Sequence, residues 1–91
     1  MAVTMTEFQF HPDPIQSAPG RATFAVTNVG TVAHDFTLLT AGGHARIAHT
    51  APVAPGATVR VTLTLAAGSY PVVCTQPGHQ EAGMESRLEV R

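Results

Sequence analysis

Short β-prone runs, separated by turn residues at close intervals, constrain the fold of this chain more than any other feature. Valine, threonine and phenylalanine dominate the runs. The turn signals are Pro12 to Pro14, Pro19-Gly20, Gly42-Gly43, Pro55-Gly56, Gly68 and Pro77-Gly78. Regularly spaced turns of this kind are typical of all-β sandwiches and barrels. The sequence therefore predicts an all-β fold of about seven to eight strands.

The segment 58–65 has the clearest strand pattern, because Val59, Val61, Leu63 and Leu65 alternate with arginine and threonine. This period of two indicates a strand with one buried face. Similar patterns predict strands over 3–10, 21–28, 69–73 and 87–90, a weaker one at 47–50, and one through Phe36 and Leu38. No segment favours a helix, and at most a helical turn is expected within 42–49 or 78–84.

The length and composition indicate one ordered domain, residues 1–91. The chain is 44% hydrophobic and 12% charged, and about two-thirds of the surface of so short a chain can be buried. Five arginines, six acids and no lysine give a net charge of −1, so no basic stripe exists to bind nucleic acid. No apolar run reaches the roughly 18 residues of a membrane span, and the N-terminus has no signal-peptide pattern. We expect no membrane contact by this chain itself.

The segment 74–84 places Cys74, His79 and Met84 in one short loop with proline and glycine between them. A thiolate, imidazoles and a weakly held thioether together suit copper. The loop lacks a second histidine, and His34, 40 residues before Cys74, supplies a candidate. A lone cysteine is more often a small buried hydrophobic residue, but the histidine and methionine that follow favour metal binding. The predicted ligands are His34, Cys74, His79 and Met84, for one copper ion.

The order of motifs along nearly the whole chain resembles that of the cupredoxins, the small blue-copper electron-transfer family that includes plastocyanin and azurin. The matching segments are 7–10 with the prolines that follow, 19–20, 28–30, 34–36, 55–56, 68–70 and the 74–84 loop. The resemblance implies a two-sheet Greek-key β-sandwich with one type 1 copper ion. It also implies an electron-transfer protein that is not an enzyme, and a periplasmic or extracellular location. We expect a mature domain excised from a longer precursor or from a membrane-tethered protein.

The resemblance further assigns roles around the ligands. Asp35 should accept a hydrogen bond from Thr75 and so tie the His34 strand to the cysteine loop. The backbone amides of Asp35 and Gln76 should donate to the thiolate. The edge of His79 should reach the surface within an apolar patch, where a redox partner protein would dock; the patch comprises Pro77, Gly78, Ala82 and Gly83.

Other functions are weaker alternatives. A copper carrier or storage module without a redox partner remains open, as does a sandwich that has lost metal binding. A single cysteine cannot form a disulfide or a zinc site of several thiolates, and methionine in the loop has no use in a cysteine protease. The remaining histidines, His11, His44 and His49, are predicted to be solvated. The four phenylalanines are predicted to fill the core.

Overall fold

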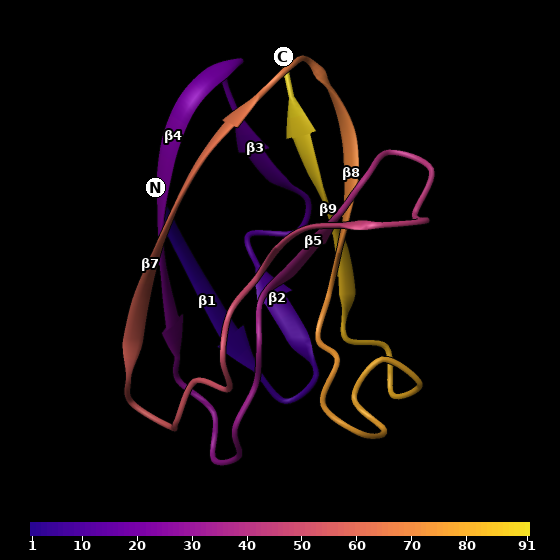
Figure 1. The fold of residues 1–91 in the computed structure, drawn as a ribbon. Coiled ribbons are helices and arrows are strands. Elements are labelled where there is room, and N and C mark those ends of the chain that lie inside the picture. Colours follow the sequence, from indigo (N-terminus) through magenta and orange to yellow (C-terminus); the bar gives the residue numbers. More distant parts are fainter.

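A computed structural model describes residues 1–91 and contains nine strands in two sheets (Figure 1). The strands are β1 Ala2–Thr6, β2 Gln9–His11, β3 Ile15–Ser17, β4 Gly20–Asn28, β5 Thr37–Leu39, β6 Arg46–His49, β7 Thr58–Leu65, β8 Gly68–Val73 and β9 Glu85–Val90. One sheet has the order β2-β1-β4-β7 and the other β3-β9-β8-β5-β6. The predicted all-β, two-sheet fold is confirmed.

The pairing of β4 with β7 shows how the alternating pattern builds the sandwich. The two strands are antiparallel, with Phe24 opposite Val61, and both side chains face the other sheet within or against the core. On the outer face Thr23 and Thr62 share a hydrogen bond of 2.9 Å between their hydroxyl groups. The segment 58–65 is thus the strand that its sequence predicted, with the same bounds.

Aromatic side chains from both sheets meet in the core. Phe10, Phe24 and Phe36 are fully buried. The ring of Phe36 packs edge-on against Phe10 at 6.1 Å between centroids, and nearly parallel to Phe24 at 6.3 Å. Such pairs add roughly 0.5–1.5 kcal/mol each to the burial of their area. Three of the four phenylalanines therefore have the predicted core position.

The N-terminal half contains the two departures from the predicted strands. The segment 3–10 is not one strand but the hairpin of β1 and β2, in which Thr6 pairs with Gln9. Neither glycine, asparagine nor proline marks the turn at Glu7 and Phe8, so its sequence carries no hairpin signal. Strand β3 was not predicted, because it is only three residues long and lies between prolines. It pairs with β9 in parallel.

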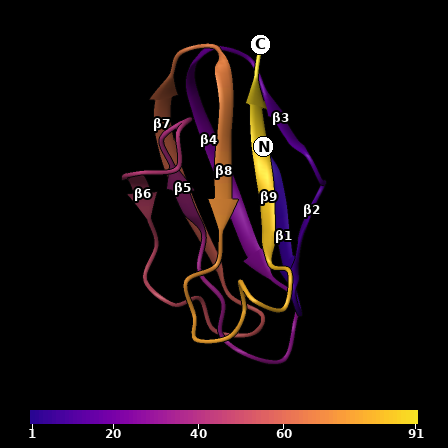
Figure 2. The same ribbon diagram turned by 90° about the vertical axis from the view of Figure 1, so that its right-hand side faces the viewer.

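Three loops gather at one end of the sandwich, the lower end in Figures 1 and 2: the β4–β5 connection, the β6–β7 connection and the β8–β9 connection. The C-terminus lies at the other end. No helix of the structure is long and apolar enough to cross a membrane. The 78–84 segment forms only a helical turn, in which the Ala82 amide donates to the Gly78 carbonyl at 3.1 Å.

Candidate metal centre

His34 is held in the β4–β5 loop by its own backbone and by a buried asparagine. It exchanges backbone hydrogen bonds with Val53, at 3.3 and 2.7 Å. The Asn28 amide donates to the carbonyls of Val32 and Val53, each at 2.8 Å, and its oxygen accepts from the Gly30 amide at 2.9 Å. Both Asn28 and His34 are fully buried. The backbone that carries the histidine ring is therefore fixed before any metal binds.

The β8–β9 loop closes on itself and directs its side chains inward. The Met84 amide donates to the His79 carbonyl at 3.0 Å, and the Cys74 amide donates to the Met84 carbonyl at 3.3 Å. Gly78 and Gly83 have φ values of +80° and +102°, a conformation that residues with a Cβ rarely adopt. The glycines therefore let the eleven residues 74–84 leave and re-enter the sandwich at one point.

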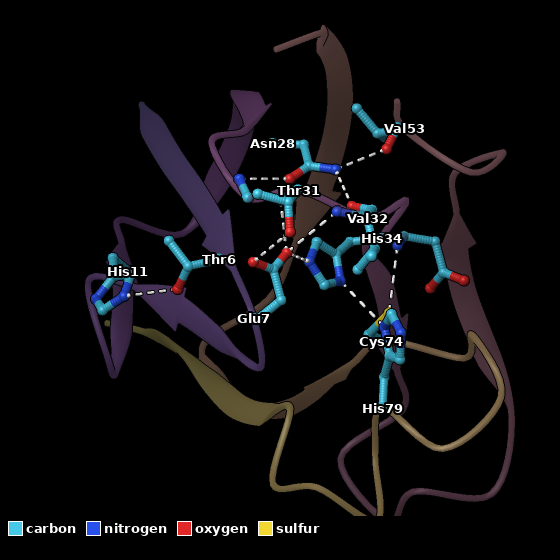
Figure 3. Close-up of polar contacts among 12 residues, drawn as sticks. Thr6, Glu7, His11, Asn28, Thr31, Val32, His34, Val53, Cys74 and His79 are labelled. Atoms are coloured by element: carbon cyan, nitrogen blue, oxygen red, sulfur yellow. Dashed lines mark hydrogen bonds and ion pairs between the residues drawn. The ribbon is translucent and has the colours of Figure 1, made fainter. Parts of the chain in front are cut away.

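The donor atoms of His34, Cys74 and His79 converge at this point (Figure 3). All three lie within 4.8 Å of one another. The Nδ1 atoms of the two histidines are 3.0 Å apart, and Nδ1 of His79 is 3.4 Å from Sγ of Cys74. Cys74 is fully buried, like His34, whereas His79 is half-buried. One thiol and two imidazoles in this arrangement are the donor set of a type 1 copper site.

Met84 is fully buried as part of the core cluster. Its backbone is bonded to both Cys74 and His79, so it belongs to the same closed loop. Its role as the weak fourth ligand stays a prediction.

The environment of Cys74 keeps its thiol protonated when no metal is present. Burial raises the pKa of the thiol, the amides of Asp35 and Gln76 lower it by hydrogen bonding, and the Asp35 charge raises it, with a net upward shift. The Asp35 amide lies 3.4 Å from Sγ. A metal that binds the thiolate must therefore displace this proton.

Asp35 ties the two ligand segments together. Its carboxylate accepts from the Thr75 hydroxyl at 2.6 Å and the Thr75 amide at 2.9 Å, so the bond expected from Thr75 is present. Gln76 and Thr37 donate to the same carboxylate through their side chains, both at 2.9 Å. Burial by itself would raise the pKa of Asp35, but these bonds, with the Thr75 hydroxyl and Gln76 foremost, hold it below its usual value.

Two residues at the site were not predicted, Glu7 and Phe8 in the β1–β2 turn. Oε1 of Glu7 lies 2.9 Å from Nε2 of His34 (Figure 3). The Phe8 ring packs edge-on against His79 at 5.0 Å and lies 6.4 Å from the His34 ring. Phe8 was predicted to be a core residue, and it is only half-buried. The only signal in the sequence was the 7–10 segment. Its pattern predicted a continuous strand and did not indicate that Glu7 and Phe8 form a turn at the site.

The other histidines stay away from the cluster. His11, His44 and His49 are exposed, as predicted. His49 shares a hydrogen bond of 2.7 Å with the Thr37 hydroxyl, and His11 one of 3.3 Å with the Thr6 hydroxyl. They provide controls for substitutions at the site.

Comparisons with known proteins agree with this geometry. The model of the copper-binding plastocyanin/azurin family matches residues 1–91. A reduced auracyanin from the photosynthetic bacterium Roseiflexus castenholzii superposes with a TM-score of 0.87 at 21% identity, over 99% of this chain and 94% of that one. Auracyanin A from Chloroflexus aurantiacus, described as a blue copper protein, gives 0.79 at 23% identity over the whole of both chains. A mutant of amicyanin in its reduced Cu(I) form gives 0.76 at 18%, over 100% and 81%. No curated protein sequence matches significantly.

Proposed function

Because the chain belongs to the plastocyanin/azurin family of copper-binding proteins, we propose that it carries single electrons on one copper ion. The proposed ligands are Nδ1 of His34, Sγ of Cys74, Nδ1 of His79 and, more weakly, the Met84 sulfur. The observation that carries the proposal is the convergence of the first three atoms within 4.8 Å at one end of the sandwich. When bound, copper supplies the Cu(II)/Cu(I) couple.

Rigidity is what the protein contributes to this task. Three of the proposed ligands share a loop whose backbone is bonded to itself, and the fourth, His34, is fixed by Asn28 and Val53. His34 and Cys74 are fully buried, so water has little access to them. Ligands that barely move between two oxidation states leave little reorganisation to accompany electron transfer.

His79 provides the electron's route to the surface in this proposal. Its ring is half-buried, while the neighbouring Pro77, Gly78, Ala82 and Gly83 are exposed and uncharged. A redox partner protein docking on this patch would approach the copper through one imidazole ring. Transient redox complexes use small interfaces, often below about 1,200 Å², which suits so small a patch.

The proposal extends to the whole chain. Residues 1–91 would act as one domain, since the family match covers all of them. By family analogy the protein works in the periplasm or outside the cell, as an electron carrier and not as an enzyme.

The test is a visible spectrum after stoichiometric Cu(II) is added. We expect an intense thiolate-to-copper charge-transfer band that is present in the wild type and in His44→Ala, and is lost in Cys74→Ser. A colourless wild type, or an intense band that survives Cys74→Ser, would contradict the assignment. Cyclic voltammetry then separates the alternative function, because a copper carrier or storage protein needs neither a reversible couple nor fast self-exchange.

A further inference from the structure

The carboxylate of Glu7, in the β1–β2 turn, accepts hydrogen bonds from the loop that carries His34 (Figure 3). Oε1 lies 2.8 Å from the Thr31 amide, 3.3 Å from the Val32 amide and 2.9 Å from Nε2 of His34. Oε2 accepts from the Thr31 hydroxyl at 3.2 Å. Two amides, a hydroxyl and an imidazole N–H that all donate to one carboxylate stabilise its ionised form and hold it in one orientation.

Gly30 shows that the loop is shaped around this carboxylate. A Cβ placed on Gly30 would lie 2.1 Å from Oε1 and 2.8 Å from Cδ of Glu7, far inside van der Waals contact. Gly30 does not have a positive φ, so its backbone conformation does not demand glycine. A side chain at position 30 would instead require the Glu7 carboxylate to move away from the loop.

The contact determines which nitrogen of His34 is available to a metal. An ionised carboxylate can only accept, so Nε2 of His34 carries the hydrogen. In a neutral ring Nδ1 then holds the lone pair, and Nδ1 is the atom that faces His79 and Cys74. A histidine that ligates a metal commonly donates its other N–H in this way, and the partner raises the basicity of the ligand.

We propose that Glu7 is a positioning residue for the copper site, which orients His34 through Nε2 and lowers the midpoint potential with its negative charge. The inference rests on the proposed function, since it takes His34 to be a ligand. A carboxylate one imidazole ring from the metal stabilises Cu(II), the more highly charged state, more than Cu(I). A purely structural role would be to secure the loop, but Asn28 already secures it with three bonds from the other side.

Glu7→Gln tests the charge with little change in shape. Oε1, which takes three of the four contacts, is retained as an amide oxygen. The amide nitrogen would replace Oε2, whose one partner is the Thr31 hydroxyl, and a hydroxyl can turn to accept. We expect the ratio of Cu(II) to Cu(I) affinity to fall about tenfold, which for a one-electron couple raises the midpoint potential by about 59 mV. The blue band should remain.

Glu81→Gln is the matched control, because it removes the same charge from an exposed position in the ligand loop. If Glu7→Gln keeps its blue band and shifts the potential no more than Glu81→Gln does, the proposal is overturned while the copper function stands. A wild type without the blue band would instead contradict the proposed function itself.

Two further measurements do not depend on Glu7→Gln folding. In the diamagnetic Cu(I) wild type, nitrogen-15 NMR should show a protonated Nε2 on His34 whose hydrogen exchanges slowly with water. A His34 protonated at Nδ1 would overturn the proposal. Gly30→Ala should displace the carboxylate while keeping its charge on the chain, and should also raise the potential; an unchanged potential would again overturn it.

Discussion

The backbone amide of Asp35 donates a hydrogen bond to Sγ of Cys74 across 3.4 Å, although the two residues are 39 positions apart. The residue after one proposed ligand thereby touches another, and the Asp35 side chain binds Thr75 and Gln76 beyond it. The backbone and the side chain of Asp35 thus both connect the His34 segment to the cysteine loop. Substitution can change the number of backbone amides that donate to the sulfur.

The first prediction concerns the second of these amides, that of Gln76, which also lowers the pKa of Cys74. The thiolate is more anionic in the Cu(I) state, because Cu(II) draws more electron density from the sulfur, so donors to the sulfur favour Cu(I) and raise the potential. Gln76→Pro removes an amide donor and should lower the midpoint potential measured by voltammetry. Gln76→Ala is its control, since it loses only the side-chain bond to Asp35. Equal potentials in the two variants would argue against an amide donor at residue 76.

The second prediction concerns Met84, whose bond to copper we expect to be long and weak. Met84→Gln should keep copper and lower the midpoint potential, because an amide oxygen is a harder ligand that favours Cu(II). Met84→Leu should keep copper and raise the potential. Copper content and voltammetry provide the measurements. Loss of copper from both variants would show that Met84 is needed to assemble the site.

The third prediction is about stability. Asn28→Ala removes three hydrogen bonds made by a fully buried side chain. A hydrogen bond contributes about 1 kcal/mol to stability, so the apo protein should lose about 3 kcal/mol in urea unfolding. Thr23→Ala, which breaks an exposed pair with Thr62, should cost under about 1 kcal/mol. Similar losses in both would mean that Asn28 does not hold the His34 loop.

The fourth prediction tests the route through His79. Ala82→Lys places a charge in the proposed patch without touching a ligand, so it should slow electron self-exchange by more than about tenfold at moderate salt, where exposed charges are screened over about 10 Å. Ala67→Lys is the control, because the exposed β7–β8 turn lies at the far end of the sandwich (Figure 1). A spectrum unchanged from wild type shows that the site is intact. Self-exchange within twofold of Ala67→Lys would place the exit elsewhere.

The parts of the site that could be predicted from the sequence are those that depend on local spacing. Cys74, His79 and Met84 share a loop, so their proximity follows from chain length alone. Strand 58–65 could equally be predicted, because the alternation of apolar and polar residues indicates which face of a strand is buried. Both signals are contained in fewer than about a dozen consecutive residues, which is the range over which such patterns are informative.

Glu7 could not be found in this way. Its contact with His34 joins residues 27 positions apart, one in the β1–β2 turn and one in the β4–β5 loop, and alternation says only that Glu7 faces outward. The role of Gly30 was equally hidden, because its missing Cβ leaves room for a carboxylate from the β1–β2 turn. The hairpin at Glu7 and Phe8 is what brings both residues to the site. Contacts of this kind arise from how sheets pack, which neither propensity nor spacing encodes.

The separation of His34 from His79 by 45 positions has a consequence for how the protein matures. His34 lies shortly before β5 and Cys74 directly after β8, so the donor atoms come together only once these two strands have paired. Pairings between distant segments are the slow events of folding. The colour that copper gives during refolding should therefore mark the pairing of β5 with β8. Copper that binds these side chains before the strands pair would instead slow the folding of the chain.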